Sequence, residues 1–176
     1  GAGDEGEDII ENASKFDGVL QKIEDTTVKF VRGEIVISKA NFAQLPEGAY
    51  SNRRNAVSGI ARRYDGEHSD KLSIYSYDIG GNTAYATETE KVIALNKLGF
   101  KVPFTIVDYN EDVYHQYAMI RTTAEDYQMD GFVLKNDDLS GQIALKFPPE
   151  GEVTFITGYE WNVGATGAVI PKVLFE

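Results

Sequence analysis

Charged residues inside apolar stretches are the first feature of this sequence that could do chemistry, because such charges are costly unless they are paired or used. In the segment 31–36, Glu34 follows a glycine within a run of β-branched residues. Glycine at such a place leaves room for a ring or sugar to approach the backbone. The carboxylate could then accept hydrogen bonds from ribose hydroxyls. The alternative is an edge-strand glutamate that faces solvent.

Two arginines mark the second stretch, which spans residues 51–63 and is rich in small side chains. Arg54 and Arg62 are eight positions apart, so on one helix they would lie roughly on one side. Paired guanidinium groups suit phosphate oxygens, which they can hold in bidentate fashion. The alternative is a solvated basic face.

Two lysines end the series, each inside an apolar strand. In the segment 129–135, Asp130 stands at the entrance of a strand in which Val133 and Lys135 share one face. Lys146 lies in the similar segment 143–148. A lysine at such a place can reach a phosphate. The alternative for each is an amine that extends to solvent along its own apolar stem.

The elements that position these residues alternate between helix and strand patterns. Apolar residues at helical spacing predict helices over 8–13, 39–45, 55–63, 87–98 and 110–124. Gly99 supplies a C-terminal cap for the fourth helix and Asn110 an N-cap for the fifth. β-Branched and alternating runs predict strands over 27–37, 72–79, 102–107, 131–135, 142–147 and 151–160. The predicted class is α+β, with antiparallel strands and helices on the outside.

The net charge, the cysteine count and the length of apolar runs exclude several classes of protein and site. The 176 residues carry a net charge of −11, so any contact with nucleic acid must come from a local cluster of cations. The absence of cysteine excludes disulfides and thiolate zinc sites in this chain. No apolar run approaches membrane-spanning length and no signal-peptide pattern is present, so we expect a cytoplasmic protein.

The motifs in their order resemble those of the NAD⁺-dependent DNA ligases. The series comprises Arg-Gly-Glu at 32–34, Asn-x-Arg-Asn-Ala-x-x-Gly at 52–59, Asp-Gly-x-x-x-Lys at 130–135, Lys-Phe-Pro at 146–148 and Val-Gly-x-Thr-Gly at 163–167. The segments 3–12, 98–102 and 161–171 are similar to that family as well. The resemblance implies a partial nucleotidyltransferase (adenylation) domain of antiparallel sheets with flanking helices over residues 1–155. It implies a truncated start of an OB-fold module over 156–176.

This resemblance also implies roles for the charged residues. Glu34 would hold the adenosine sugar, and Arg54 and Arg62 would contact phosphates of the nucleotide or of the nick. Glu34 and Asp130 are the candidate ligands of Mg²⁺. Arg121 is a weaker match to a further arginine of the family, since its spacing is off by about a residue.

Three residues are implied in the chemistry itself. Asp130 would lie near the nucleophile and the metal ion, and Lys135 and Lys146 would grip the α-phosphate. Val133 would lie against the adenine. All of these residues, with Glu34 and the two arginines, are expected to converge around one adenylate-sized cavity.

The chain departs from the family pattern at the nucleophile. In the family the attacking lysine sits in Lys-x-Asp-Gly, upstream of the segment that resembles residues 3–12. Here Lys15-Phe16-Asp17-Gly18 matches the motif by letter but lies too close to Glu34. We therefore interpret residues 15–18 as a helix exit followed by a turn. Ala2 and Ala165 stand where the family usually has arginine, and the linker 138–143 is short.

Two functions fit this pattern. In one, the chain is part of a split ligase, of the kind found in some phages, that seals nicks in duplex DNA with NAD⁺ as AMP donor and Mg²⁺. A second polypeptide would then supply the nucleophilic lysine and the NMN-binding module. In the other, it is a catalytically inactive nucleotide-binding or assembly protein. We favour the split enzyme, because an inactive protein has no need of six site residues in register; ATP in place of NAD⁺ stays open.

Overall fold

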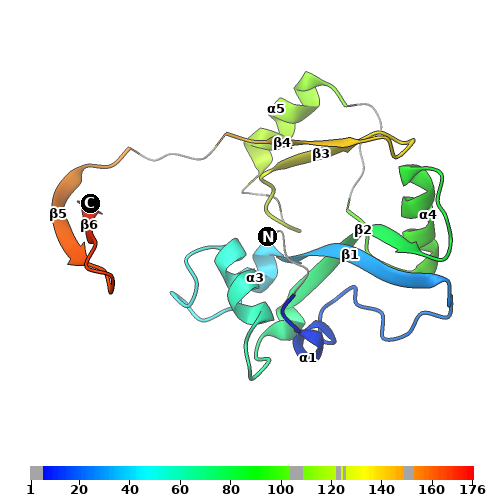
Figure 1. Cartoon of the computed structure of the whole chain (residues 1–176), viewed down its shortest axis with the longest axis horizontal. Helices are drawn as coiled ribbons and strands as arrows, with labels where there is room; N and C mark the ends of the chain where they lie inside the picture. Colours follow the sequence, from blue (N-terminus) through cyan, green and yellow to red (C-terminus); the bar gives the residue numbers. More distant parts are fainter. Residues whose placement is uncertain (1–5, 104–108, 122–123, 125, 149–152) are drawn as a thin grey trace.

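The computed structural model describes residues 6–103, 109–121, 124, 126–148 and 153–176. The described helices are α1 (Ile10–Ala13), α2 (Lys39–Phe42), α3 (Arg53–Ala61), α4 (Glu88–Leu98) and α5 (Glu111–Ile120), with a 3₁₀ turn over Ser69–Lys71. The described strands are β1 (Val28–Ile37), β2 (Leu72–Gly81), β3 (Gly131–Lys135), β4 (Gln142–Lys146), β5 (Ile156–Val163) and β6 (Val169–Phe175). They form three antiparallel pairs, β1–β2, β3–β4 and β5–β6, as Figure 1 shows.

Apolar and polar side chains alternate along β1 and β2, so their sheet has an apolar face and a polar face. Ile35 and Ile37 lie opposite Ile74 and Leu72, and Glu34 lies opposite Tyr75. The register shifts between Arg32 and Gly33, which puts a bulge in β2. A Cβ on Gly33 would lie 2.7 Å from Ile74 Cγ1 and 2.8 Å from the Tyr75 carbonyl oxygen. This glycine therefore permits close strand pairing. The prediction that it leaves room for a ligand is wrong, because Ile74 fills the space beside it.

The main core lies between the apolar face of this sheet and the helices α1 and α3. Its buried members are Phe16, Ile37, Leu45, Ala56, Ile60, Ala61 and Leu72. The Asn12 side-chain amide ties α1 to the end of α3, since it donates to the carbonyl oxygens of Ala61 at 2.9 Å and Arg63 at 2.8 Å. One buried side chain thereby satisfies two carbonyl groups at the end of a helix.

Helix α4 covers the other end of the sheet. Thr87 caps its N-terminus through a hydrogen bond to the Glu90 amide, and Gly99 ends it with φ 91°. The Gly99 cap was predicted from the sequence and is confirmed; the Thr87 cap is found only in the structure. Leu95 is fully buried, and so is Ile79 of β2, so each end of β1–β2 has its own apolar contact layer.

Helix α5 covers one face of the β3–β4 pair. The Asn110 side chain accepts a hydrogen bond from the Val113 backbone amide, so Asn110 is the N-cap that was predicted. The helix ends at Ile120 rather than near residue 124. Phe132 contacts the rings of Tyr117 and Phe147, with centroids 5.5 Å apart in both cases. This aromatic cluster fixes α5 on the face of the pair that carries Phe132.

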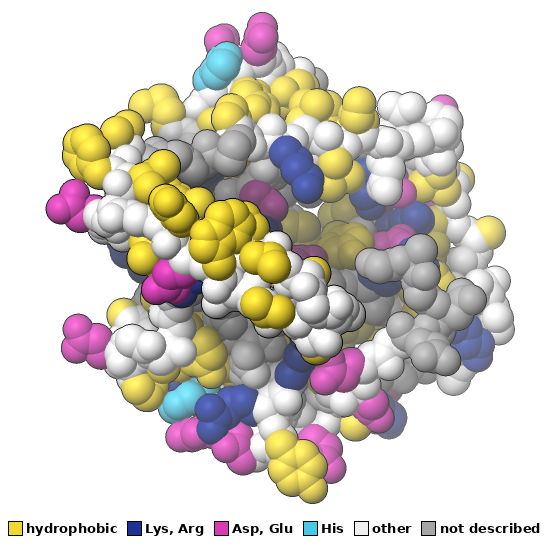
Figure 2. Space-filling model, turned by 60° about the vertical axis from the view of Figure 1, so that its left-hand side comes forward, with side chains coloured by type: hydrophobic (Ala, Val, Ile, Leu, Met, Phe, Trp, Pro, Cys, Tyr) yellow, Lys and Arg dark blue, Asp and Glu magenta, His cyan; other side chains and the backbone are white. Residues whose placement is uncertain are grey.

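The β5–β6 hairpin is drawn apart from the other elements in Figure 1. One of its faces is apolar and exposed, and its side chains are Tyr159, Trp161, Val163, Val169, Pro171 and Val173. Figure 2 turns this side forward and shows hydrophobic side chains gathered there. The predicted bounds 151–160 are wrong for the described residues, because β5 begins at Ile156 and runs to Val163.

Other predictions agree within a few residues, and one falls largely outside the described part. The predicted helix 39–45 ends at Phe42, and the predicted strand 102–107 lies mostly among residues 104–108, which the structure does not describe. Among the described helices, none is long and apolar enough to cross a membrane.

Candidate functional site

The face of β3–β4 opposite α5 carries the two predicted phosphate-binding lysines. Directly paired residues of antiparallel strands project to the same face. Gly131 pairs with Lys146 and Val133 with Ala144, so Val133, Lys135 and Lys146 share one face. The Lys135 amine lies 3.4 Å from the carbonyl oxygen of Tyr77 in β2, which shows that this face looks toward the β1–β2 sheet.

The polar face of β1–β2 looks back at the same space. Glu34 is paired with Tyr75 and therefore shares its face. The Tyr75 ring contacts Tyr127, in the segment that leads into β3, with centroids 4.9 Å apart. In Figure 1 the two sheets lie one above the other, with α1 on the far side of β1. The face of β1–β2 that carries Glu34 and the face of β3–β4 that carries Lys135 are thus turned toward each other.

An ion pair closes one end of this region. Arg54, in the first turn of α3, places Nη2 2.5 Å from Asp130 Oδ2. The hydrogen bond to Asp130 raises the pKa of Arg54, and the charge of Glu34 adds a smaller effect in the same direction. Both paired side chains are largely exposed, at 75% and 67%. Arg54 and Asp130 are thus in direct contact, and Glu34 is near enough for its charge to act on Arg54.

A second group of charges closes the other end, where Lys135 contacts α4. Its amine lies 2.7 Å from Glu88 Oε2. Glu88 Oε1 lies 3.0 Å from the Lys91 amine, which in turn lies 3.0 Å from Asp78 Oδ1. Burial opposes the ionised form of Glu88, but hydrogen bonds from both lysines outweigh burial and lower the pKa of Glu88. Lys135 is therefore engaged by protein groups in this structure.

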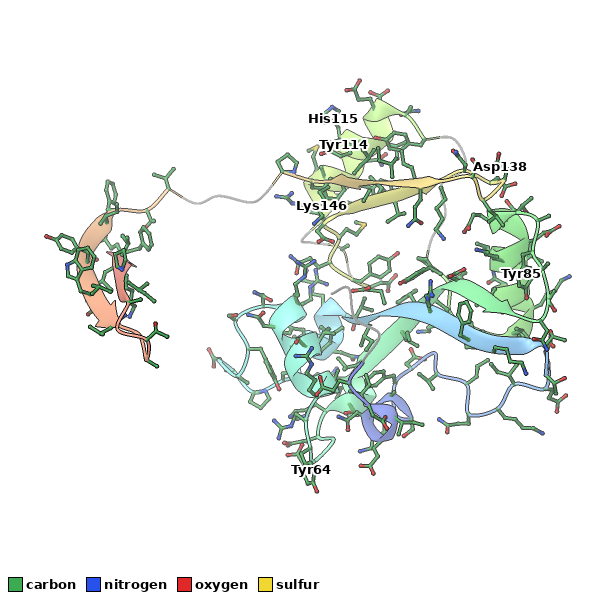
Figure 3. All side chains as sticks on the ribbon, in the orientation of Figure 1. Tyr64, Tyr85, Tyr114, His115, Asp138 and Lys146 are labelled. Carbon is green, nitrogen blue, oxygen red and sulfur yellow. The ribbon has the colours of Figure 1, made fainter. Side chains whose placement is uncertain are left out.

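Lys146 and Val133 are the open part of the face. Lys146 is exposed, and its amine makes no hydrogen bond or ion pair with the described residues. Its carbonyl oxygen accepts a 3.0 Å hydrogen bond from the Tyr114 hydroxyl, which anchors the backbone of β4 to α5; Figure 3 labels both residues. Val133 is 58% exposed although it sits in a short apolar strand. An exposed apolar side chain beside a free amine suits the base and phosphate of a nucleotide.

Arg62 does not lie beside Arg54. Helix α3 ends at Ala61, and Arg62 is its C-cap with φ −104° and ψ 3°. Its Nε lies 2.8 Å from Glu7 Oε2, whereas Arg54 at the first turn reaches Asp130. Arg62 thus stands one residue beyond the helix that carries Arg54, and the two arginines pair with different carboxylates.

Arg121 and Lys15 are held by backbone carbonyls. The Arg121 guanidinium donates to the Pro148 carbonyl oxygen and lies 5.9 Å from the centre of the Phe147 ring. The Lys15 amine donates to the Gly66 carbonyl oxygen at 3.3 Å. Asp17 pairs its backbone with β2, donating to the Leu72 carbonyl oxygen at 3.0 Å. Residues 15–18 thus form a helix exit and a short edge beside β2.

The cavity and the carboxylates of Glu34 and Asp130 lie in different parts of the molecule. A cavity of about 390 Å³ lies elsewhere, against α2 and residues 45–50, and none of the predicted site residues lines it. Among the described residues, no group of three or more histidine or carboxylate side chains could hold a metal ion. Glu34 and Asp130 offer two carboxylates, a number that suits Mg²⁺ when phosphate oxygens and water complete its shell.

Several residues of the region were not singled out from the sequence. Glu88 looked like an ordinary acidic residue in a first helical turn, and only its tertiary contact with Lys135 distinguishes it. Arg53 is buried, and its guanidinium donates to the Ala124 carbonyl oxygen at 2.9 Å. A charged side chain at a helix start within a small-residue stretch was the available signal, but it pointed equally to Arg54.

Facing antiparallel sheets with flanking helices, followed by a further hairpin, make this an α+β protein of the nucleotidyltransferase kind. A family model described as the NAD-dependent DNA ligase adenylation domain matches residues 1–150. The chain belongs to that family.

Similar curated proteins are named DNA ligase. One from Sorangium cellulosum is 29% identical over 192 aligned residues, which cover 100% of this chain and 28% of the relative. Others from Lactobacillus delbrueckii and Latilactobacillus sakei are each 33% identical, with 100% of this chain and 30% of the relative covered. The chain thus spans less than a third of the length of these relatives.

Proposed function

We propose that this chain binds the adenylate of NAD⁺ and its phosphates as part of an enzyme that seals nicks in duplex DNA. The observation that carries the proposal is the contact of Arg54 with Asp130, at the entrance of a strand pair whose one face carries Lys135 and Lys146. Glu34 is near enough for its charge to act on Arg54. Family membership supports NAD⁺ as the nucleotide, since the matching family model describes the adenylation domain of NAD-dependent DNA ligases.

Each of these side chains has a role in the proposal. Glu34 accepts hydrogen bonds from the ribose, and the exposed side chain of Val133 lies against the adenine. The free amine of Lys146 contacts the α-phosphate, and Lys135 joins it after leaving Glu88. Arg54 and Arg62 serve phosphates of the nucleotide or of the nick.

The chemistry that these groups would assist is nucleophilic catalysis by a neutral lysine. Its nitrogen forms a bond to the α-phosphorus while the bond to the leaving nicotinamide mononucleotide breaks, and the amine gives up a proton. The AMP then passes to the 5′-phosphate of the nick, and the 3′-hydroxyl displaces it. Fixed cations such as Lys146 stabilise the charge that gathers on phosphate oxygens. Mg²⁺, held by Asp130 and Glu34 together with phosphate oxygens, would neutralise further charge.

The attacking lysine is supplied, in this proposal, by a second polypeptide that also carries the NMN-binding module. The support is the position of Lys15, the lysine of the tetrad that matches by letter. Its amine is on the Gly66 carbonyl oxygen, and α1 lies on the side of β1 away from β3 and β4. We further propose residues 1–155 as the adenylation domain and 156–176 as the first strands of an OB module, in a cytoplasmic protein of a bacterial or phage-infected cell.

Transfer of labelled adenylate tests the proposal. The chain is incubated with Mg²⁺ and NAD⁺ that carries label in its adenylate, alone and with candidate partner polypeptides from the same genome. ATP labelled in the same position runs in parallel. The proposal expects a covalent label on a partner, from NAD⁺ and not from ATP, and only when both chains are present.

The other outcomes each contradict a part of the proposal. Label at Lys15 of this chain would overturn the assignment of the nucleophile to a partner. Binding of NAD⁺ without label under any pairing would favour the inactive nucleotide-binding alternative. No binding of NAD⁺ or AMP at all would overturn the assigned site.

A further inference from the structure

Lys135 is the one predicted phosphate-binding lysine whose amine is already occupied. Of its three N–H donors, one goes to Glu88 Oε2 at 2.7 Å and one to the Tyr77 carbonyl oxygen at 3.4 Å. Its side chain is only 25% exposed, and that of Glu88 only 18%. A partly buried ion pair is screened less by solvent than an exposed one, so this contact is costly to break.

The carboxylate cannot easily follow the amine if Lys135 moves. Two hydrogen bonds tie helix α4 to the β3–β4 turn. The Glu88 backbone amide donates to the Asp137 carbonyl oxygen at 2.9 Å, and the Thr89 backbone amide donates to Asp137 Oδ1 at 2.8 Å. The second oxygen of Glu88 is held by Lys91, which Asp78 holds in turn. Glu88 is thus fixed by its backbone and by its side chain.

The four charged side chains of the network around Glu88 carry no net charge. Lys135 and Lys91 carry two positive charges, and Glu88 and Asp78 carry two negative ones. Arg32 adds a positive charge 3.5 Å from Asp78, but its side chain is 66% exposed. A phosphate that approaches Lys135 therefore meets a fixed carboxylate beside the amine, and the two anions repel each other.

We infer that Glu88 competes with a nucleotide phosphate for Lys135 and so sets how tightly the site binds phosphate. The inference rests on the proposed function, because it needs Lys135 to contact a phosphate. In the nucleotide-free protein Glu88 holds the amine against α4. Binding transfers one charged hydrogen bond of Lys135 from the carboxylate to the phosphate, at the cost of the ion pair.

Paired titrations with AMP and adenosine test this inference, since the two ligands differ only in the phosphate. Glu88→Gln should tighten AMP binding about three- to tenfold, because the amide keeps its size but removes the competing charge. Adenosine binding should not change. Glu90→Gln is the matched control, because Glu90 lies on the same helical turn and the substitution changes the net charge equally. The Glu90 carboxylate accepts a hydrogen bond from the Ala86 backbone amide and not from Lys135. The Glu90→Gln variant should bind AMP as the unaltered chain does.

A double variant links the effect to Lys135. In a Lys135→Met background, Glu88→Gln should tighten AMP binding less than it does in the unaltered chain, because the competition for the amine is gone and only the repulsion between carboxylate and phosphate is relieved. Glu88→Ala repeats the test if the glutamine variant folds poorly by circular dichroism. Equal or weaker AMP binding by both Glu88 variants would overturn the inference while leaving the proposed function intact. If the unaltered chain binds neither AMP nor NAD⁺, the proposed function fails and the inference fails with it.

Discussion

Arg54 Nη2 and Asp130 Oδ2 lie 2.5 Å apart although 76 positions separate them in the sequence. The contact joins the first turn of α3 to the entrance of β3, and Glu34 lies close enough to influence the pKa of Arg54. A pair so exposed contributes little to stability, with a typical value below about 1 kcal/mol. Under the proposed function, the pair holds a cation and a carboxylate beside the nucleotide.

The first prediction concerns this pair. Arg54→Ala should change the free energy of unfolding by less than about 1 kcal/mol, because the ion pair is solvent-screened. The same variant should weaken AMP binding about tenfold, since a charged hydrogen bond to phosphate contributes about 1.5–3 kcal/mol. Urea denaturation and ligand titration on the same sample measure the two effects. A large loss of stability with unchanged AMP affinity would assign the pair a structural role.

The second prediction concerns Lys146, whose amine is free among the described residues. Lys146→Ala should leave the fold intact and lower adenylate transfer to the partner polypeptide by about 100-fold or more, because a preorganised charge at the phosphate is lost. The labelling assay provides the rate and circular dichroism the control. Lys172→Ala is the matched lysine substitution: that residue lies on the hairpin paired with Glu160, and the rate should not change. A normal rate for Lys146→Ala would remove its phosphate role.

The third prediction uses a glycine. A Cβ on Gly131 would lie 2.1 Å from the Leu145 carbonyl oxygen and 2.8 Å from Lys146 Cα, both backbone atoms that cannot rotate away. Gly131→Ala should therefore destabilise the protein by about 1–3 kcal/mol, the range of typical backbone and packing defects. Gly141→Ala is the control, since a Cβ there meets no atom within 4 Å. Equal melting temperatures for the two variants would contradict the close approach of β3 to β4.

The fourth prediction concerns pH. The pKa of Glu88 is lowered in the folded chain, so its contribution to stability is present above the unfolded value and is lost as pH falls through the folded one. Because a free glutamate has a pKa of about 4.3, the loss should begin as the pH falls toward that value. Between pH 6 and about pH 3, Glu88→Gln should lose less stability than the unaltered chain. Parallel acid-dependent slopes in urea titrations would show that Glu88 does not carry the effect.

Local signals made the helix ends and strand pairs predictable. Thr87, Gly99 and Asn110 each satisfy backbone groups of their own helix, so their types mark the boundaries without help from the rest of the chain. Alternation along residues 28–37 and 72–81 was likewise enough to predict two half-buried strands.

Long-range contacts could not be predicted in the same way. The partner of Lys135 is Glu88, 47 positions away, and no local pattern links a strand-end lysine to a first-turn glutamate. Arg62 lies just outside its predicted helix because α3 ends at Ala61, two residues before the predicted end at 63. Gly33 was misinterpreted because its neighbour Ile74 belongs to another strand. Each error comes from tertiary packing that a single segment does not encode.

The most direct test of the central claim is a map of backbone amide chemical shifts during titration with AMP. The bound adenylate should shift amides around Glu34, Arg54 and Asp130 and along β3 and β4, because these groups face one region. Amides near Lys15 and the cavity at residues 45–50 should stay in place. Shifts confined to that cavity or to α1, with β3 and β4 unmoved, would contradict a nucleotide site between the two sheets.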